Sequence, residues 1–385
     1  MKIIMDFRKY DGVIGGVEQG AIQITRWMSA NQHRVVLLCK EIQFQKVKDL
    51  FDGVPGVDIH PLPVRSHVMS AENSALDSGY IQDLAVREKV DVIHFYYNWS
   101  FPRNRKAPCL LTVHDVIPFT FREAMPFFRN RFVYRPSLQH ACRLNDLVAT
   151  VSEYSKQDIA KKVGVPPEKI RVIPNGLREP NPEDPSTVKA LEGRCRIHEP
   201  FILNVGGIHE RKNIVRLIGA FERLVKERGY GGRLIITGST SGAPYQEKMK
   251  KICDAAVART GIADRILFTG FVTEKELDHL LRRAQLLIYP SLYEGFGIPI
   301  LEAMKVGTPV VTSNVTAMPE VAEGAALLVD PLDIGAMAEA MDRLLKDDAL
   351  REELREKGFQ RAQPYSWAQT GKLYFEVYQE LAARK

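Results

Sequence analysis

Short apolar runs alternate along the chain with longer amphipathic stretches whose apolar positions recur with the period of a helix. In the first half, the runs are rich in β-branched residues and bounded by turn residues, which predicts strands. These strands are expected at residues 2–7, 34–38, 90–94, 109–114, 147–151 and 170–173, with a helix at residues 17–29. Alternating strands and helices predict a parallel sheet with helices on both faces, joined by right-handed crossovers.

The same alternation restarts after a proline-rich stretch at residues 174–185, which is typical of a linker. The second half predicts strands at residues 201–205, 234–237, 265–268, 286–289, 310–312 and 326–329, and helices at residues 213–228, 246–258, 274–284 and 298–306. The pattern therefore predicts an α/β protein with two Rossmann-like, doubly wound domains facing a cleft. Ligands of such sheets bind outside the carboxyl ends of the strands. A last helix, from Trp367 to about Ala383, follows every strand and could pack on either domain.

The composition excludes several classes of protein. The 385 residues are 45% hydrophobic and 26% charged, as in a soluble globular protein of about two domains. Five scattered cysteines without a C-x-x-C pair argue against a disulfide framework and a structural zinc site. No apolar run approaches a membrane span, and the first run is too short for a signal peptide, so we expect a cytoplasmic protein. The net charge of +6 permits anionic ligands or an anionic membrane surface.

The densest chemical signal is the segment Y-P-S-L-Y-E-G-F-G-I-P-I-L-E-A-M at residues 289–304. A strand ends there, a loop with Gly295 and Gly297 follows, and a proline falls in the first turn of the next helix. Open backbone N–H groups at a helix N-terminus form an anion site. Glu294 and Glu302 would repel a phosphate, but they fit the hydroxyl groups of a sugar and a ribose. The alternative is a tight turn with a surface glutamate on each side.

A second signal, L-N-V-G-G-I-H-E-R-K-N at residues 203–213, also joins a strand to a helix. Gly206-Gly207 would let a ligand approach the backbone closely. Arg211 and Lys212 place two cations at the helix start, where the helix dipole is already positive. A bound diphosphate would resolve this conflict. The alternative is two solvated basic residues that tolerate the dipole.

Two weaker signals lie in the first half. Gly15-Gly16 forms a turn before the first helix that could admit a phosphate, although such a turn is most often only geometry. His114 closes an apolar strand at its carboxyl end, where a catalytic and a packed histidine are about equally expected. The chain has no G-x-G-x-x-G after a strand and no P-loop, which disfavours a dinucleotide oxidoreductase and a P-loop kinase. It also has no D-x-D and no metal-spaced His and Cys residues, so no metal site is predicted.

The stretch at residues 119–143 interleaves aromatic and basic residues, with Glu123 as its only acid. Such a composition suits an interfacial surface on anionic lipid, and it would also suit nucleic acid. The other interpretation is a core helix whose arginines extend into solvent. The residues concerned are Phe119, Phe121, Phe127, Phe128, Phe132 and Tyr134, with Arg122, Arg129, Arg131, Arg135 and Arg143.

Together these segments resemble glycosyltransferase family 4, on the GT-B fold. The segment from Glu294 to Glu302 resembles the family's E-G-F-G-x-x-x-x-E motif, and residues 205–213 resemble its V-G-x-x-x-x-R-K-N variant. The likeness covers nearly the whole chain and is strongest at residues 172–331. One departure is Gly207, where many members have arginine. Shorter matches are Gly15-Gly16, Val113-His114-Asp115, Ile173-Pro174-Asn175-Gly176 and Ser366-Trp367.

The resemblance implies transfer of a sugar from a nucleotide sugar, with retention of anomeric configuration and without a required metal or other cofactor. Glu294 would hold the hydroxyl groups of the donor sugar, Glu302 the ribose, and His114 would lie beside the reacting carbon. Arg211 and Lys212, with the glycine turn of the first half, would hold the diphosphate. His114 and Glu294 are thus the expected catalytic residues, and the expected donor contacts are Gly15, Gly16, Gly207, Arg211, Lys212, Phe271, Val272, Gly295, Phe296, Gly297, Ile298 and Glu302.

The resemblance also implies domain roles and partners. Residues 1–176 would bind the acceptor, residues 177–365 the nucleotide sugar, and a helix at residues 366–385 would cross back to the first domain. Because the R-K-N variant resembles members that use GDP-mannose, we expect mannose as the sugar. A glycan or polyprenyl-linked acceptor in cell-surface polysaccharide or lipopolysaccharide synthesis would place the protein in the cytoplasm or peripherally on the inner face of the membrane. From the sequence itself, Tyr96, Tyr97, Asn98 and Trp99 follow a strand and are candidates for the acceptor site, and the alternative is a set of ordinary core aromatics, which is at least as much expected.

Three other functions remain open from the sequence. A GT-B epimerase or phosphorylase would share the fold and the nucleotide or phosphate site. A two-lobed sugar-binding protein without catalysis would not need two cations at a helix start. A nucleic-acid-binding protein could use the aromatic and basic stretch at residues 119–143, but we expect no nucleic acid partner.

Overall fold

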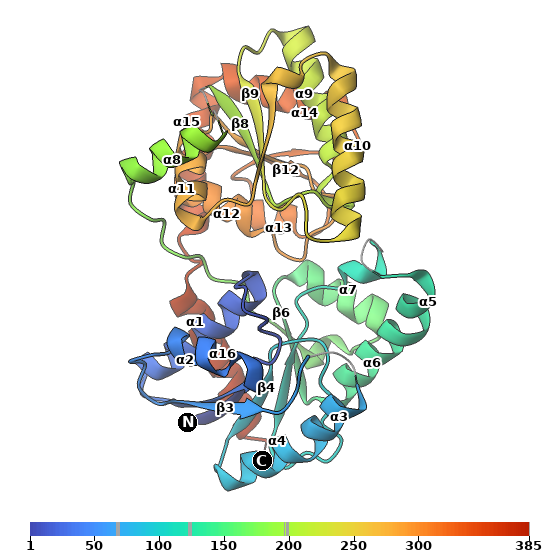
Figure 1. Cartoon of the computed structure of the whole chain (residues 1–385), viewed down its shortest axis with the longest axis vertical. Coiled ribbons are helices and arrows are strands. Elements are labelled where there is room, and N and C mark those ends of the chain that lie inside the picture. The colour runs from blue at the N-terminus through green and yellow to red at the C-terminus, as the bar shows by residue number, and fades with distance from the viewer. Residues whose placement is uncertain (67–69, 122–124, 196, 198–199, 385) are drawn as a thin grey trace. The chain divides into compact units, whose positions relative to one another are not determined.

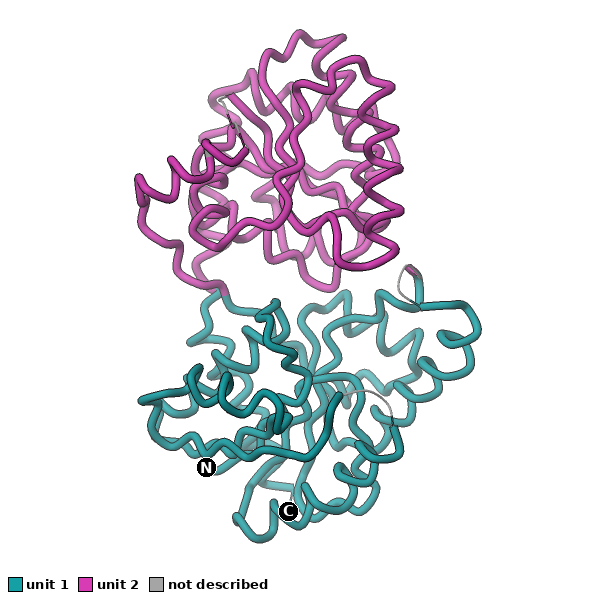
Figure 2. Tube along the Cα trace, viewed as in Figure 1, with its two compact units in different colours: residues 1–120, 125–176, 365–385 teal, residues 121–124, 177–364 magenta. Residues whose placement is uncertain are grey.

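The computed structural model describes residues 1–384 apart from 67–69, 122–124, 196 and 198–199. The chain divides into two compact units (Figure 2). Unit 1 comprises Met1–Thr120, Met125–Gly176 and the C-terminal segment from Tyr365, and unit 2 is made mainly of Leu177–Pro364. Each unit is a parallel sheet covered by helices (Figure 1), so the prediction of two Rossmann-like domains is confirmed.

Unit 1 is built on a 7-stranded parallel sheet with the strand order β3-β2-β1-β4-β5-β6-β7. The strands are β1 (Lys2–Asp6), β2 (Arg34–Lys40), β3 (Val57–Leu62), β4 (Val92–Phe95), β5 (Cys109–Thr112), β6 (Leu147–Thr150) and β7 (Ile170–Val172). The helices are α1 (Gly16–Ala30), α2 (Phe44–Leu50), α3 (Ala71–Ser78), α4 (Tyr80–Arg87), α5 (Phe127–Arg129), α6 (Arg135–Leu144), α7 (Glu153–Val163) and α16 (Trp367–Ala382), with the short turns η1 (Glu41–Gln43), η2 (Ile117–Phe119), η3 (Asn130–Tyr134) and η4 (Pro167–Lys169).

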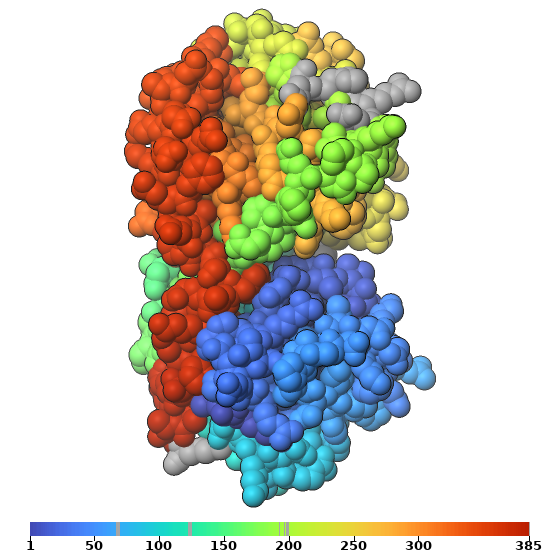
Figure 3. All heavy atoms as spheres, turned by 90° about the vertical axis from the view of Figure 1, so that its left-hand side faces the viewer, coloured from blue at the N-terminus to red at the C-terminus, as the bar shows by residue number. Residues whose placement is uncertain are grey.

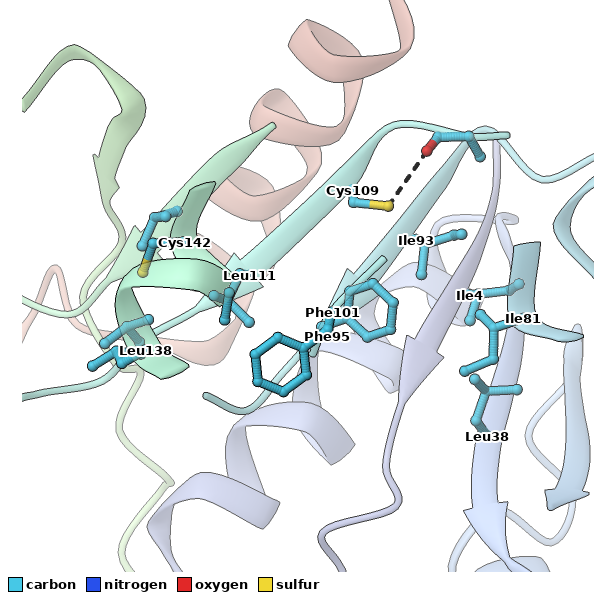
Figure 4. Packing of buried hydrophobic residues seen from close by; sticks show 14 of the residues in the cluster. Ile4, Leu38, Ile81, Ile93, Phe95, Phe101, Cys109, Leu111, Leu138 and Cys142 are labelled. Atoms are coloured by element: carbon cyan, nitrogen blue, oxygen red, sulfur yellow. Dashed lines mark hydrogen bonds between the residues drawn. The ribbon is translucent and has the colours of Figure 1, made fainter. Parts of the chain in front are cut away.

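The alternation of side chains along β1 explains how unit 1 builds a core on both faces of its sheet. Ile3 and Met5 pack into one apolar cluster with α1 and α16, whereas Ile4 packs into the cluster on the other face. Successive residues of a strand point to opposite faces, so a continuous apolar run is the pattern of a strand covered on both sides. Figure 4 shows part of the second cluster, in which Ile93 lies near Ile4 and beside Cys109.

The last helix packs against unit 1. α16 lies along α1 (Figure 3), and both belong to the same apolar cluster. Its Gly371 faces Trp27 so closely that a Cβ atom at this position would lie 2.3 Å from Trp27 Cγ. Farther along, the hydroxyl of Tyr378 lies 2.7 Å from Nδ1 of the buried His94 in β4. The docking of α16 therefore depends on a glycine that leaves room for a tryptophan and on a buried hydrogen bond.

Gly371→Ala is expected to lower the stability of unit 1, because the added methyl group has no room beside Trp27. Overpacking of this kind costs about 1–3 kcal/mol. Gly193→Ala in α8 is the matched control, since nothing lies within 4 Å of its Cβ position. Differential scanning calorimetry of the full chain should show a lower unfolding midpoint for Gly371→Ala alone. Equal midpoints for both variants would show that α16 does not depend on this contact.

Unit 2 is built on a 6-stranded parallel sheet with the strand order β10-β9-β8-β11-β12-β13. The strands are β8 (Phe201–Val205), β9 (Arg233–Thr237), β10 (Ile266–Gly270), β11 (Leu287–Tyr289), β12 (Val310–Ser313) and β13 (Leu327–Val329). The helices are α8 (Pro185–Cys195), α9 (Ile214–Arg228), α10 (Pro244–Thr260), α11 (Glu274–Arg283), α12 (Ile298–Lys305), α13 (Met318–Ala322), α14 (Ile334–Lys346) and α15 (Asp348–Ala362), with the short turns η5 (Glu210–Lys212) and η6 (Ala263–Arg265).

Several helices of the structure were not predicted, namely α2, α3, α4, α6, α7, α14 and α15, and three further differences bear on the argument. β3 was not predicted, because its sequence V-D-I-H-P-L mixes polar residues and a proline, which suits an edge strand. α8 begins at the end of the predicted linker, at Pro185. α9 begins at Ile214, so Arg211 and Lys212 lie in the preceding turn η5 and not in the helix. Among the described residues, no helix is both long enough and apolar enough to cross a membrane.

Candidate active site

Two loops of unit 2 meet at one edge of its sheet. They follow β8 and β11, which are parallel neighbours, so their carboxyl ends lie at the same edge. The backbone N–H of Leu292 donates a hydrogen bond to the carbonyl oxygen of Arg211 (2.7 Å), which joins the two loops directly. The two strongest signals of the sequence are thereby brought together in space.

Arg211, Lys212 and Glu294 form one ionic cluster, in which Lys212 and Glu294 are buried and Arg211 is half-buried. Lys212 Nζ lies 2.8 Å from Oε1 of Glu294, and Nη1 of Arg211 lies 2.5 Å from the same oxygen. Lys212 Nζ also donates a hydrogen bond to the hydroxyl of Tyr289 (2.5 Å) and lies 4.4 Å from the centroid of its ring. Tyr289 was not predicted as a site residue. Its only signal was its place at the end of the strand before the glycine loop.

The charges of this cluster follow from its burial. Burial lowers the pKa of Lys212 to about 8, and Glu294 partly opposes that shift. Burial alone would raise the pKa of the Glu294 carboxyl, but Lys212 and Arg211 outweigh burial and hold that pKa at about 2. At neutral pH the cluster therefore holds two cations and one carboxylate, which leaves one positive charge in a largely desolvated place. Such a charge attracts an anion more strongly than it would in water.

The two glycines after β8 leave space that other residues of the protein occupy. Gly206 has φ +123°, and a Cβ atom there would lie 2.7 Å from Lys212 Nζ. Gly207 has φ +72°, and a Cβ atom there would lie 3.0 Å from the carbonyl oxygen of Ser239. Side chains rarely adopt these φ values, so both positions require glycine for conformation as well as for space. The protein atoms that approach these glycines are those of Lys212 and of the loop after β9, and the close approach of a ligand stays a prediction.

Asn213 holds the loop after β8 in place, a role that the sequence did not reveal. It has the left-handed φ of +62°, which asparagine tolerates better than most residues. Its Nδ2 donates hydrogen bonds to the carbonyl oxygens of Pro290 (3.1 Å) and Pro331 (2.6 Å). The asparagine of the R-K-N motif therefore connects three loops at the carboxyl edge of the sheet.

The glycine loop after β11 leads directly into α12. Gly297 is the residue before the helix and has φ +113°, and Ile298 begins the helix. Phe296 is buried, whereas Ile298 is half-buried. The backbone N–H of Glu294 donates to Oγ1 of Thr316 (3.2 Å), which fixes the residue before Gly295. The first N–H groups of α12 therefore follow the ionic cluster in the chain, as an anion site requires.

Glu302 lies one turn into α12 and contacts a different set of charges. Its Oε1 is 3.8 Å from Nε of Arg178, and the guanidinium of Arg178 also makes two short hydrogen bonds, of 2.6 and 2.5 Å, to Asp278 in α11. Burial raises the pKa of Glu302 to about 7, which Arg178 opposes and Asp278 and Glu274 reinforce. Arg178 is thus already bound to Asp278, and Glu302 keeps much of its capacity to accept hydrogen bonds.

Phe271 and Val272, two of the predicted donor contacts, lie beyond β10. Phe271 directly follows that strand and its side chain is 73% exposed, and Val272 is half-buried. Thr273 then caps α11, accepting a hydrogen bond from the backbone N–H of Glu276 (3.3 Å). An exposed phenylalanine at the carboxyl edge of a sheet offers a free aromatic face, which suits stacking on a planar ring.

His114 lies in unit 1, two residues beyond β5. Its Nε2 is buried and has no hydrogen-bond partner among the described residues. Burial lowers the pKa of the imidazole to about 4, against a hydrogen bond with the backbone of Tyr96, so the ring is neutral at pH 7. Buried polar atoms without a partner are uncommon. This nitrogen therefore has an unused capacity for one hydrogen bond.

In the glycine turn of unit 1, a backbone N–H group is already hydrogen-bonded to a side chain of the protein. Glu18 of α1 accepts a hydrogen bond from the backbone N–H of Gly15 (3.1 Å), so this carboxylate already occupies part of the helix N-terminus. Gly16 is exposed, and nothing lies within 4 Å of its Cβ position. A phosphate at this turn would have to displace the carboxylate of Glu18 from Gly15.

The predicted acceptor residues differ in exposure. Tyr96 is buried in the core of unit 1, whereas Tyr97, Asn98 and Trp99 are half-buried. Trp99 packs edge-on against Tyr134, with ring centroids 5.0 Å apart. Only the last three residues of this loop therefore present surface.

A cavity of about 650 Å³ opens elsewhere in unit 1, between α3 and α6. Four serines, Phe101 and His140 contribute to its wall. It contains none of the predicted site residues. Among the described residues, no group of three or more His, Cys, Asp or Glu side chains is placed to hold a metal ion.

The comparisons with known proteins agree with the motifs. Residues 14–179 match the family model described as Glycosyltransferase Family 4, and residues 196–361 match the one described as Glycosyl transferases group 1. The chain is 32% identical over 288 residues to the O-antigen chain mannosyltransferase B of Escherichia coli, which covers 74% of each protein. It is 27% identical over 274 residues to the serotype-specific mannosyltransferase WbdA of Escherichia coli, which covers 70% of this chain and 33% of WbdA.

The likeness extends to solved structures. The structure of Anabaena HepE in complex with UDP-glucose matches with a TM-score of 0.76 at 18% sequence identity, covering 99% of this chain and 100% of that one. At this level of identity the match shows a shared fold.

Proposed function

The chain belongs to glycosyltransferase family 4 and has the GT-B fold, and on that premise we propose that it transfers mannose from GDP-mannose to a glycan or lipid-linked acceptor, with retention of anomeric configuration. Both Escherichia coli relatives are described as mannosyltransferases, and one of them acts on the O-antigen chain. The proposal places this chain in the synthesis of a cell-surface glycan. HepE, which binds UDP-glucose, supports a nucleotide sugar as the donor class.

The observation that carries the proposal is the ionic cluster of Arg211, Lys212 and Glu294. Two cations share a single carboxylate oxygen, at 2.5 and 2.8 Å, and retain one positive charge. A diphosphate would bring the negative charge that this cluster lacks. Glu294, which stays ionised, would then exchange part of its contact with the cations for the hydroxyl groups of the sugar.

The proposed mechanism is stabilisation of the leaving group. The bond between the anomeric carbon and the diphosphate oxygen breaks, and negative charge grows on the diphosphate. Lys212 and Arg211 are held in place by Glu294 and Tyr289 before the reaction begins, so they need no reorganisation to meet that charge. The acceptor hydroxyl attacks the anomeric carbon from the face of the departing diphosphate, and its proton passes to that diphosphate. Glu302 would hold the ribose, and in unit 1 His114 is the candidate for a contact with the transferred sugar.

The identity of the donor is tested with two measurements: the thermal shift that each nucleotide sugar causes, and the transfer of its sugar to an acceptor. GDP-mannose, GDP-glucose, UDP-glucose and ADP-glucose are compared at the same concentration. A ligand at about 100 times its dissociation constant adds about 2.7 kcal/mol of stability. We expect the largest shift with GDP-mannose and the net appearance of a mannosylated acceptor. A larger shift with another donor would replace mannose in the proposal, and conversion of the donor without transfer would favour the epimerase.

Activity is expected to survive an excess of EDTA. The cations of Arg211 and Lys212 can supply the positive charge that a divalent ion supplies elsewhere, and the sequence has no D-x-D to bind one. The measurement is the initial rate of transfer with EDTA and with added Mg²⁺ or Mn²⁺. Complete loss that only a divalent ion restores would contradict this part of the proposal.

A further inference from the structure

An exposed aromatic surface lies on α5 and the following turn η3 of unit 1. Three phenylalanines and a valine point into solvent there, and we call these four residues the aromatic patch. The exposed fractions of the residues are 48% for Phe127, 73% for Phe128, 66% for Phe132 and 39% for Val133. Phe128 stacks on Phe132 with ring centroids 6.1 Å apart, and Phe127 meets Phe128 edge-on at 5.6 Å. Soluble proteins rarely expose several neighbouring aromatic rings without a use for them.

The backbone fixes which side chains of this segment face outward. η3 is a π-helical turn between α5 and α6, and such turns are rare and frequent at functional sites. Its Asn130 and Tyr134 point inward and are buried, which leaves Phe132 and Val133 outside. The sequence interpretation of this stretch as a core helix with extended arginines is therefore wrong for its phenylalanines, because three of them lie on the surface.

The base of the patch is firmly anchored. Arg135 donates hydrogen bonds to Oδ1 of Asn130 (3.2 Å) and to the carbonyl oxygen of Phe119 (3.0 Å), and its guanidinium lies 4.5 Å from the centroid of the Phe119 ring. Tyr134 packs edge-on against the same ring, at 5.5 Å. Phe119 and Arg135 thus belong to the support of the patch and not to its surface.

The formal charges of the segment that carries the patch, residues 125–144, are all of one sign. Arg129 and Arg131 are exposed and, among the described residues, make no ion pair. From residue 125 to residue 144 the sequence contains four arginines and no acid. Arg122 and Glu123, which the sequence interpretation included, lie outside the described residues. A protein partner would commonly be matched by mixed charges, whereas an anionic lipid surface is matched by cations alone.

We propose that the aromatic patch, with Arg129 and Arg131, docks unit 1 on the surface of an anionic lipid bilayer. The phenylalanine rings would enter the region between head groups and acyl chains, and the two arginines would contact lipid phosphates. The segment lies at an outer edge of unit 1 (Figure 1). This surface is independent of the residues proposed for transfer, and binding can be measured without any donor or acceptor.

The test is co-sedimentation of the full chain with vesicles. We expect binding to vesicles rich in phosphatidylglycerol and a partition coefficient roughly 25-fold lower on pure phosphatidylcholine, since each arginine near an anionic surface contributes about fivefold. Raising the salt concentration should remove the difference between the two lipids. Equal binding to both vesicle types, or no binding to either, would overturn the proposal.

Paired variants distinguish vesicle binding through the aromatic patch from nonspecific adsorption of the protein. Phe128→Ser with Phe132→Ser should lower binding roughly 100-fold, since loss of each inserted ring costs about tenfold or more. Arg129→Gln with Arg131→Gln should lower it roughly 25-fold on anionic vesicles and leave binding to phosphatidylcholine unchanged. The control is Ile42→Ser in η1, a residue with the same 66% exposure as Phe132. A comparable loss in the control would overturn the assignment to this patch.

A fluorescent variant reports insertion directly. Phe132→Trp should shift its emission to shorter wavelength on anionic vesicles, because the indole leaves water. A fall in the sedimentation coefficient of lipid-free protein on Phe128→Ser with Phe132→Ser would identify a second copy of the chain as the occupant. That result, or an unchanged emission of Phe132→Trp with vesicles, would overturn the proposal of a lipid surface.

Discussion

Lys212→Ala is expected to lower turnover roughly 100- to 1000-fold, as does the loss of one preorganised donor to a developing oxyanion. Lys212 Nζ is buried beside Glu294 and Tyr289, so neither solvent nor another lysine can replace its charge. The charge on the diphosphate grows toward the transition state. The loss should therefore fall mainly on kcat and less on the dissociation constant of the donor. Turnover of the unmodified enzyme should also decline as the pH rises through about 8, where the buried ammonium group loses its proton.

The controls for this prediction lie in the same region. Lys226→Ala removes an exposed lysine of α9 that forms an ion pair with Glu222, and it should leave turnover unchanged. Arg211→Ala should lower turnover as much as Lys212→Ala does, because Gly207 has no side chain that could supply the missing positive charge. Calorimetric unfolding of each variant separates loss of catalysis from loss of fold. Near-normal turnover in both Lys212→Ala and Arg211→Ala would refute the assignment of the diphosphate to this cluster.

Glu294→Gln and Glu302→Gln are expected to weaken different parts of donor binding. Glu302 is assigned to the ribose, which nucleoside diphosphate and intact donor share, and Glu294 to the transferred sugar, which only the donor carries. A hydrogen bond to a charged group contributes about 1.5–3 kcal/mol, and because burial raises the pKa of Glu302 to about 7, the comparison is made above that pH, where Glu302 is ionised. Glu302→Gln should therefore weaken both ligands by about 10- to 150-fold. Glu294→Gln should weaken the donor and depress turnover, and leave the nucleoside diphosphate nearly unchanged.

Isothermal titration calorimetry with both ligands on both variants makes this comparison. The Glu294→Gln variant has a second effect, since the charge of Glu294 also offsets one of the two cations. Its loss leaves Arg211 and Lys212 less compensated, which would strengthen the binding of free nucleoside diphosphate if it changes that binding at all. If Glu294→Gln weakens the nucleoside diphosphate as much as the donor, the two roles are exchanged or both residues are structural.

The fold was largely predictable because its signals are local. Buried parallel strands such as β1 and β8 have continuous apolar sequences, and helices such as α1 and α9 repeat their apolar positions with the helical period. Two of the elements that were not predicted are only partly buried. β3 is an edge strand with a proline, and α8 follows a stretch rich in prolines, so neither has the pattern of a fully packed element.

The sequence alone was enough to predict which loops would carry the chemistry, because glycines, cations and carboxylates at the ends of strands are visible in order along the chain. Only the tertiary structure decided how these residues are used. The neighbourhood of β8 and β11 brings Lys212 within 2.8 Å of Glu294, across 82 positions of sequence. In the same packing, the side chain of Lys212 occupies the space beside Gly206. Burial then sets the pKa values of Lys212 and Glu294, since a charge in a desolvated place depends on the partners that surround it and not on the residues beside it in the chain.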